Sequence, residues 1–360
     1  MKQTPLFQLH VELGARFGAF AGYDMPLFYP LGVIGEHRHT RSATGLFDIS
    51  HMVQVELQGS NAAALVAHLC PYPAGTQQTG RSRYSFFLNE DAGMIDDVIV
   101  TRLFEDRFLI VCNAGCAQKD LLHVAKHAAG FQVAVTVHER ALLAVQGPHA
   151  ENALSRLAMD VADLDFLDAR ELAGGRFVSR SGYTGEDGFE IAMATSEIEP
   201  FARALLADKS VQMIGLAARD SLRLEAGLSL YGQDLAEDIT PMEAGLAWAI
   251  PQSHRSGGSF VGAAALARKF AEGRARKRVG LIPDGSAPVR AHAAITDPAG
   301  RKVGEVTSGG FGPTVNHPIA LGLVETNAGD SLFADLRGRP IGLKQVTLPF
   351  VPHNYKHKAN

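Results

Sequence analysis

Residues 93–100 have the sequence Gly93-Met94-Ile95-Asp96-Asp97-Val98-Ile99-Val100, in which two adjacent acids interrupt an apolar, β-branched run. The run follows the turn-like segment Asn89-Glu90-Asp91-Ala92-Gly93, so it is typical of the second strand of a β-hairpin. Successive strand residues point to opposite faces, which puts Asp96 with Met94 and Val98, and Asp97 with Ile95 and Ile99. We expect both faces to be buried.

A carboxylate in such surroundings is costly unless a partner pairs with it or donates hydrogen bonds to it. Two interpretations of the acids are open at this point. One is a general base or a group that stabilises developing charge, because apolar surroundings suit both roles. The other is a structural ion pair or a cap for the neighbouring turn.

The composition limits the class of protein. A chain of 360 residues exceeds one ordinary core, so two or three domains are expected. A hydrophobic content of 46% with 20% charged residues is typical of a soluble globular protein. No apolar stretch approaches the length of a transmembrane helix, and a net charge of −4 argues against nucleic-acid binding. Three cysteines predict no disulfide framework and indicate a reducing compartment, with buried or helix-end thiols at Cys70, Cys112 and Cys116.

Helical and β-type segments alternate over the first three quarters of the chain. The patterns predict helices at 6–17, 33–42, 117–129 and 216–226, strands at 53–57, 84–88, 96–101, 108–111 and 142–146, a turn-rich loop at 21–26 and a hairpin at 177–192. Short, often antiparallel strands mixed with helices indicate an α+β fold. From Val279 onward, short β-type runs broken by Gly and Pro predict a separate all-β barrel or sandwich.

Several familiar signatures are missing from the sequence. No dinucleotide-binding glycine motif, phosphate loop, GxSxG elbow or HExxH motif is present in a suitable context. His123 and His127 have a spacing that can bind zinc, but no further ligand cluster is near, so we expect solvated histidines there and at His37 and His39. The basic cluster 274–278 is expected to be a solvated helix end.

Three distant segments carry charged or aromatic groups that packing alone does not require. Glu190 follows the turn of the 177–192 hairpin and points away from the face of its apolar neighbours. Arg219 and Arg223 are i,i+4 neighbours on a largely apolar helix, where like charges repel unless anions lie beside them. Tyr355 belongs to a proline-rich aromatic tail. Together with Asp97, they predict one polar pocket assembled from several segments.

The whole chain resembles the T-protein family of the glycine cleavage system, the tetrahydrofolate-dependent aminomethyltransferases. The resemblance rests on blocks in the right order from end to end. They include Phe20-Ala-Gly-Tyr-Asp-Met-Pro26, Gly45-Leu-Phe-Asp-Ile-Ser-His-Met52, Gly93-Met-Ile-Asp-Asp-Val98, Gly182-Tyr-Thr-Gly-Glu-Asp-Gly-Phe-Glu190, Gly215-Leu-Ala-Ala-Arg-Asp-Ser-Leu-Arg-Leu-Glu-Ala-Gly227 and Tyr231-Gly-Gln-Asp234. Tyr23 departs from the family, which commonly has tryptophan there.

The resemblance implies an α+β, three-domain cloverleaf around a central folate channel, with an all-β, barrel-like C-terminal domain. Residues 1–273 would form the folate-binding aminomethyltransferase region, built from two interleaved α+β domains. The expected division is roughly 1–55 with 83–137 and 215–273, and 56–82 with 138–214. Residues 274–360 would form the barrel.

The implied reaction takes the one-carbon unit from the aminomethyl group on the lipoyl arm of the H-protein. The unit passes to tetrahydrofolate, which is a co-substrate, and the products are ammonia, 5,10-methylenetetrahydrofolate and reduced lipoyl. The resemblance implies no metal. The family's catalytic acid falls on Asp97, which could orient the nucleophile, accept its proton or stabilise positive charge on the one-carbon unit.

The resemblance also implies the folate-binding residues. Glu190 matches the glutamate that recognises the pterin ring, and Arg219 would hold Glu190 or a folate carbonyl. The remaining matches to the pocket are Tyr84, Asn113, Tyr183 and, in one branch of the family, Tyr355.

Two alternatives remain, one a related enzyme and one from a different functional class. A tetrahydrofolate-dependent demethylase of a small methylated sulfur or amine compound would use the same fold and need no lipoyl protein. A folate-binding maintenance protein of iron–sulfur assembly would need a reactive cysteine in the hairpin at 182–188, where this chain has none. The N-terminus shows no signal or transit pattern, so we expect a bacterial cytoplasmic protein, or a mitochondrial-matrix protein if the chain is a processed form.

Overall fold

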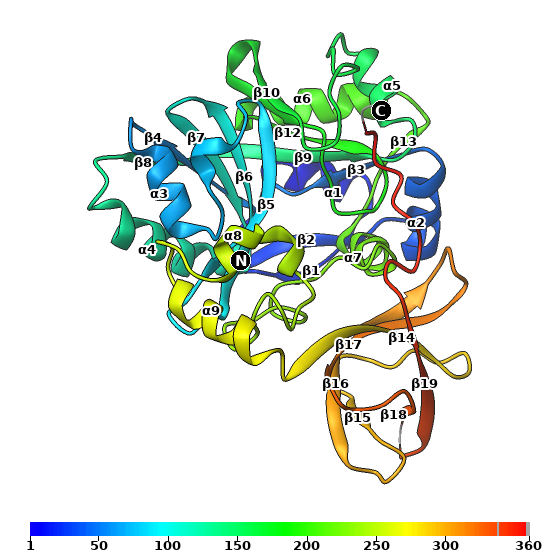
Figure 1. Ribbon diagram of the computed structural model, residues 1–360. Helices are drawn as coiled ribbons and strands as arrows, with labels where there is room; N and C mark the ends of the chain where they lie inside the picture. The colour runs from blue at the N-terminus through cyan, green and yellow to red at the C-terminus, as the bar shows by residue number, and fades with distance from the viewer. Residues whose placement is uncertain (337, 358–360) are drawn as a thin grey trace.

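The computed structural model describes residues 1–336 and 338–357. Two β-sheets lie side by side with helices on their outer sides, and a barrel formed by the last strands projects from one end (Figure 1). This mixed architecture confirms the predicted α+β class. Within the described part of the chain, no helix has the length and apolar character needed to cross a bilayer.

The first sheet has five strands in the order β5-β6-β7-β4-β8, all antiparallel. Two helices cover its outer face, where Leu65, Val66 and Val124 pack against Val98 and Phe108. The elements of this unit are β4 (Val53–Gln58), α3 (Ala62–Leu69), η1 (Ala74–Thr76), β5 (Arg81–Leu88), β6 (Met94–Phe104), β7 (Arg107–Cys112), η2 (Ala114–Cys116), α4 (Ala117–Ala128) and β8 (Ala134–His138).

The predicted acidic hairpin is formed by β5 and β6. The Asn89 side-chain oxygen accepts hydrogen bonds from the backbone N–H groups of Asp91 and Gly93, which fixes the turn. Asp96 is 0% exposed and faces the core under α3 and α4. Asp97 is only half-buried, because the inner face of this sheet borders a cavity. The expectation that both faces are fully buried was therefore wrong for the Asp97 face.

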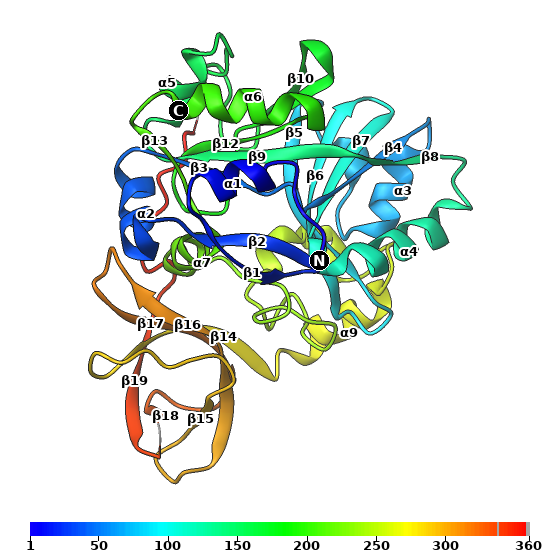
Figure 2. The same cartoon turned by 180° about the vertical axis from the view of Figure 1, so that it is seen from behind.

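The second sheet has six strands in the order β10-β11-β12-β9-β3-β13, of which only the β13–β3 pair is parallel. Strand β9 directly follows β8, so the chain passes from one sheet into the other along an extended path (Figure 2). The elements are β3 (Thr44–Asp48), β9 (Arg140–Gln146), α5 (Ala150–Ser155), β10 (Ala169–Leu172), η3 (Ala173–Gly175), β11 (Arg176–Ser179), β12 (Gly188–Ala194), α6 (Thr195–Leu206) and β13 (Val211–Met213).

A shared apolar core joins the inner faces of the two sheets to a helix. Phe47 and Leu142 of the second sheet pack with Leu109 and Val111 of the first, and with Leu222 of α7 (Leu216–Glu225). Since successive residues on a strand alternate between faces, this packing turns Asp97 of β6 and Glu190 of β12 toward the space between the sheets.

The N-terminal region differs from its prediction. Helix α1 spans only Phe7–Glu12, and Arg16–Phe20 forms strand β1, which pairs with β2 (Tyr23–Phe28). Gly14, at φ +74°, ends the helix in the left-handed conformation, and Ala15 N–H closes the end by bonding to His10 O. The expected loop at 21–26 shrinks to the turn at Ala21 and Gly22. Helix α2 (Gly32–Ser42) follows as predicted.

The last six strands close into a barrel in the order β14-β17-β16-β15-β18-β19, which decides between the barrel and the sandwich. The elements from α7 onward are η4 (Ala247–Ala249), α8 (Gln252–Arg255), α9 (Ala263–Glu272), β14 (Arg276–Pro283), β15 (Ala294–Thr296), β16 (Lys302–Gly312), β17 (His317–Glu325), β18 (Leu332–Asp335) and β19 (Pro340–Val346). Residues 276–278 of the basic cluster thus belong to a strand and not to a helix end. The division into domains at residue 273 and between the two sheets stays a prediction.

Gly147 marks the point where β9 leaves the second sheet, and we predict that Gly147→Ala strongly destabilises the fold. Its φ is +122°, and an added Cβ would collide with the carbonyl oxygens of Ala43 and Thr40. The expected loss is about 2–4 kcal/mol of unfolding free energy, measured by urea denaturation. Gly174→Ala is the matched control, because it has φ +78° with open space around it and should cost only about 1 kcal/mol. Equal losses for the two variants would contradict the steric argument.

Candidate active site

A cavity of about 1820 Å³ lies between the two sheets. Its walls come from both inner sheet faces, helix α7, the β1–β2 ribbon and the C-terminal tail. All seven residues that the sequence predicted for the site line this one cavity: Tyr84, Asp97, Asn113, Tyr183, Glu190, Arg219 and Tyr355. The structure therefore brings the predicted residues from distant segments together around one cavity, and their individual roles stay predictions.

Asp97 is held by two side chains from neighbouring strands and loops. Tyr84 on β5 donates its hydroxyl to Asp97 Oδ2 at 3.1 Å. Asn113, just after β7, donates from Nδ2 to Asp97 Oδ1 at 2.9 Å. The Asn113 side chain also bonds to Asp96 Oδ1 at 2.9 Å, so it bridges the two acids.

The surroundings of Asp97 raise its pKa above the value of an aspartate in water. Burial and the nearby charge of Asp96 raise the pKa of Asp97 to about 7, although the hydrogen bonds from Tyr84 and Asn113 lower it. A carboxyl group that titrates near neutrality can accept and return a proton at physiological pH, which an ordinary surface aspartate does poorly.

Glu190 on β12 and Arg219 on α7 both line the cavity. Burial raises the pKa of Glu190, while the charge of Arg219 and a hydrogen bond from Ser181 (3.4 Å) lower it. Arg219 lies with its guanidinium carbon 4.8 Å from the centre of the Tyr183 ring, and its buried Nη1 has no hydrogen-bond partner. A buried polar group without a partner is costly, so both side chains are suited to a polar ligand.

Arg223, one turn beyond Arg219, is occupied by structural contacts. Its side chain is 1% exposed and pairs with Asp234 at 2.8 Å and Asp220 at 2.7 Å. These anions remove the repulsion that two arginines at i,i+4 would otherwise suffer. Both arginines line the cavity, but Arg223 is held by these two acids, whereas Nη1 of Arg219 has no hydrogen-bond partner.

The C-terminal tail closes one side of the cavity. It leaves the barrel after β19, passes α2 and reaches α5, where Lys356 contacts Glu151 (Figures 1 and 2). Tyr355 stacks on Phe166, with ring centres 4.0 Å apart and planes 3° from parallel. Phe166 N–H donates to Lys356 O at 2.7 Å, and Asn354 N–H donates to Gly185 O at 2.8 Å. These bonds fix Tyr355 in the cavity wall.

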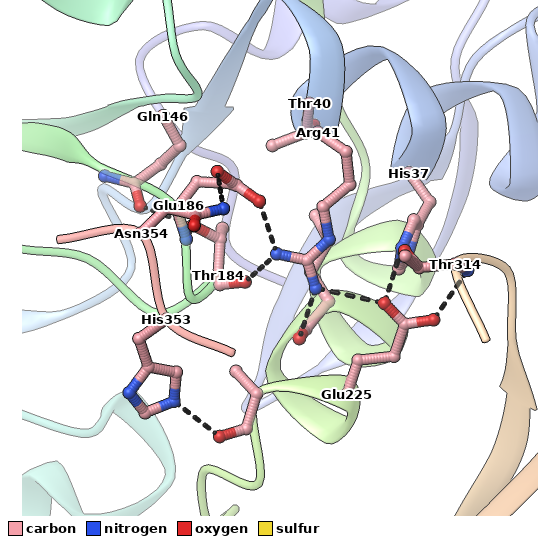
Figure 3. Close-up of polar contacts among 12 residues, drawn as sticks. His37, Thr40, Arg41, Gln146, Thr184, Glu186, Glu225, Thr314, His353 and Asn354 are labelled. Atoms are coloured by element: carbon pink, nitrogen blue, oxygen red, sulfur yellow. Dashed lines mark hydrogen bonds and ion pairs between the residues drawn. The ribbon is translucent and has the colours of Figure 1, made fainter. Parts of the chain in front are cut away.

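Arg41 on α2 is the centre of a buried polar cluster behind this wall (Figure 3). It donates to Thr184 O at 2.8 Å, Glu186 at 2.9 Å and Glu225 at 3.1 Å. Asn354 of the tail donates to the second oxygen of Glu186 at 3.0 Å. One arginine thus ties α2, the hairpin before β12, the end of α7 and the tail together.

Glu225 extends this cluster to the barrel. Its side chain is fully buried, and it accepts from Thr314 N–H at 2.7 Å and from His37 Nε2 at 3.0 Å. His37 Nδ1 also lies 2.7 Å from Ser221 Oγ, and Nε2 lies 2.9 Å from Thr314 Oγ1. The expectation of a solvated His37 was wrong, because the ring is 0% exposed and is held by Ser221, Glu225 and Thr314.

His123 also departs from the expected solvated histidine. It is buried beside Phe87, with ring centres 5.3 Å apart, and His127 lies 4.7 Å from it. His68 of α3 joins this cluster through a 3.0 Å contact with His127. The aromatic packing between α3 and α4 explains the burial.

Sequence reasoning missed three residues that line the cavity. Trp248 is 67% exposed and stacks on Tyr84 with ring centres 5.7 Å apart. Arg278, from the basic cluster, turns inward and donates to Ser229 Oγ at 2.6 Å. Buried His51 packs edge-on against Phe20. Residues 276–279 of β14 are all half-buried, so alternation along this strand gives no signal that would have identified Arg278.

The chain matches two protein-family models that together cover most of its length. The GCVT N-terminal domain matches residues 6–253, and the glycine cleavage T-protein C-terminal barrel domain matches residues 276–352. The first match contains both sheets and the cavity, and the second contains the barrel.

Relatives of known name align over nearly the whole chain. The mitochondrial aminomethyltransferase of Flaveria trinervia is 39% identical, covering 100% of this chain and 92% of that protein. The mitochondrial enzyme of Pisum sativum is 40% identical, covering 99% and 90%. The crystal structure of the glycine cleavage system aminomethyltransferase T from Bartonella henselae is 47% identical and superposes with a TM-score of 0.97, covering 99% of both chains.

The buried cluster predicts how stability depends on pH. Burial raises the pKa of Glu225, but the hydrogen bonds and charge of His37 and the bonds from Thr314 lower it to about 2, below the ordinary 4.5. A depressed carboxyl pKa contributes stability above the ordinary pKa, and that stability is lost as the pH falls toward 2. We expect this one residue to contribute about 3 kcal/mol at neutral pH.

Urea denaturation of the wild type and Glu225→Gln as a function of pH measures this contribution. The difference between them should be large at neutral pH and shrink steadily below about pH 5. Glu237→Gln, at an exposed glutamate, is the control and should show little difference throughout. A difference for Glu225→Gln that stays constant down to about pH 2 would refute the assignment.

Proposed function

The chain belongs to the glycine cleavage T-protein family of folate-dependent aminomethyltransferases, and from this premise we propose how its cavity works. The enzyme transfers the one-carbon unit of the aminomethyl group on lipoylated H-protein to tetrahydrofolate. Ammonia and 5,10-methylenetetrahydrofolate are the products of this glycine-cleavage step.

The observation that carries the proposal is the placement of Asp97 and Glu190 on the inner faces of two sheets that border one cavity. The two carboxyl groups enter from different sheets, so one can hold an extended ligand's end while the other serves the reacting atoms. The cavity of about 1820 Å³ is large enough for a folate and the end of a lipoyl arm together.

Asp97 serves the transfer step in this proposal. In its ionised form it accepts the proton that the folate nitrogen loses on bonding to the one-carbon unit. It also stabilises positive charge on that unit, and low surrounding polarity strengthens this effect. Tyr84 and Asn113 hold the two carboxylate oxygens in place, so little reorganisation is needed.

Glu190 and Arg219 recognise the pterin ring. The ring's 2-amino group and N3–H are adjacent donors, which suit the two oxygens of one carboxylate. The unpartnered Nη1 of Arg219 is suited to the neighbouring pterin carbonyl. Of the two roles expected for Arg219, this supports a hydrogen bond to the folate carbonyl more than a hydrogen bond to Glu190.

The same family assignment supports the proposed partners and bears on the location. Lipoylated H-protein is the proposed donor, and tetrahydrofolate is the proposed acceptor. The Flaveria and Pisum relatives are mitochondrial by name, which supports the matrix alternative, whereas a bacterial cytoplasmic location stays a prediction. A demethylase of small methylated compounds is not favoured, since full-length relatives are named aminomethyltransferases.

The direct test is a turnover assay with aminomethylated, lipoylated H-protein and tetrahydrofolate. Ammonia and methylenetetrahydrofolate should form in equal amounts. Folate binding without turnover on this donor, combined with turnover of a small methylated sulfur or amine compound, would replace the proposed activity with the demethylase.

Asp97→Asn should lower kcat by at least about a thousandfold while folate binding is largely kept, because the amide cannot accept a proton. In the wild type, kcat/KM should rise with pH through about 7 as Asp97 loses its proton. Asp91→Asn, at an exposed acid of the same hairpin, is the control. Near-wild-type turnover of Asp97→Asn would sink the catalytic assignment.

Glu190→Gln should weaken tetrahydrofolate binding by about 10- to 100-fold, because one charge-assisted acceptor is lost, and Glu190→Ala should weaken it further. At saturating folate, kcat should change much less. Isothermal titration calorimetry measures the affinity, with the exposed α6 variant Glu199→Gln as control. Unchanged affinity of both Glu190 variants would exclude Glu190 from pterin recognition.

A further inference from the structure

A second layer of acids lies directly behind Asp97, away from the cavity. Asp96 of β6 and Asp120 of α4 are both 0% exposed. One ligand atom from each of Asp96, Cys116 and Asp120 lies within 4.8 Å of the other two. The mechanism proposed above uses the charge of Asp96 but neither Asp120 nor Cys116, although two carboxyl groups buried side by side need an explanation.

Asn113 connects this layer to Asp97. Its backbone N–H donates to Asp96 Oδ2, and its side-chain Nδ2 donates to Asp96 Oδ1, both at 2.9 Å. The same Nδ2 donates to Asp97 Oδ1. Because both oxygens of Asp96 accept hydrogen bonds from Asn113, the side-chain amide of Asn113 cannot rotate without losing a bond. Asp96 therefore fixes the position of Asn113 Nδ2, which donates to Asp97.

Asp120 touches Asp96 from the other side. An oxygen of each side chain lies within 4.8 Å of the other, and two fully buried carboxylates this close repel each other strongly, so one of them carries a proton. Asp96 already accepts on both oxygens from Asn113, so it is the anion. Neither oxygen of Asp120 has a donor directed at it, so Asp120 carries the proton.

The surrounding charges agree with this protonation. Burial and the negative charge of Asp96 raise the pKa of Asp120 to about 10, against the lowering effect of Lys119. The Lys119 ammonium donates to Tyr231 and Glu237 instead of to Asp120. The remaining titratable neighbours, the thiols of Cys112 and Cys116, have pKa values raised by burial and stay neutral.

We propose that Asp120 is a positioning residue, which donates the proton of its carboxyl group to Asp96 and so locks Asn113 against Asp97. The proposal rests on the aminomethyl transfer proposed above for Asp97. When Asp120 is neutral, Asp96 carries the single negative charge next to Asp97. An ionised Asp120 would add a second charge and push the titration of Asp97 to higher pH.

Two substitutions in the full-length enzyme test this role. Asp120→Leu removes the donor, and we expect kcat to fall about 10- to 100-fold, with KM for tetrahydrofolate changing less than about threefold. The rise of kcat/KM with pH should shift upward, because Asp97 loses the hydrogen bond from a freed Asn113. Asp120→Asn restores a neutral N–H donor, so it should rescue kcat and the wild-type pH profile.

Wild-type kcat in Asp120→Leu would overturn the proposal. So would an Asp120→Asn variant whose pH profile moves downward, because that shift means that an ionised Asp120 was removed. If Asp120→Leu does not fold, the infrared C=O stretch of a protonated carboxylic acid decides the question. At about pH 8 it should be present in the wild type and absent in Asp120→Asn, and a wild type without it would refute the proposal. This readout is independent of turnover, so it separates failure of the proton assignment from failure of the proposed activity.

Discussion

The active site depends on partly burying a carboxyl group, Asp97, on the inner face of one of two sheets that border a cavity. Desolvation makes the ionised form expensive, and the second acid, Asp96, adds to that expense. Donors from Tyr84 and Asn113 offset part of it, so that Asp97 titrates near neutral pH instead of remaining permanently protonated. The chemistry therefore follows from packing, because the two sheets place the acid among apolar side chains at the wall of the cavity.

The same constraint explains the rest of the architecture. Glu190 and Arg219 enter the cavity from a different sheet and helix, so the sheets and α7 must keep a fixed relation for one ligand to meet all three groups. Apolar packing in the shared core holds the two sheets and α7 together. Hydrogen bonds and ion pairs of Arg41 and Glu225 then fix their orientation, because they join α2, α7, the hairpin and the tail. Thr314 connects the barrel to the same cluster. Buried charges of this kind favour one arrangement, since every alternative leaves a charge unpaired.

Much of the fold could be predicted from local patterns. Alternation and turn chemistry placed the β5–β6 hairpin, and helical periodicity placed α2, α4 and α7. The failures occurred where distant contacts override local preference. Phe17 is a strand residue because β2 pairs with β1, and His37 is buried because it contacts Glu225, 188 positions away. The sequence places Arg278 in a basic cluster that is typical of a solvated surface. The residue turns inward because β14 of the barrel packs against the segment after α7, where Arg278 donates to Gly227 and Ser229. Trp248 and the Asp120–Asp96 contact likewise join segments whose proximity no spacing in the sequence records.

The most direct test of this account is the titration of Asp97 itself, followed by carbon-13 NMR of its carboxyl carbon in the full chain. The account predicts a midpoint near pH 7, set by burial and by Asp96. A midpoint close to the ordinary aspartate value of 3.8 would show that the site is well solvated, and it would contradict the proposal that packing tunes this acid for proton transfer.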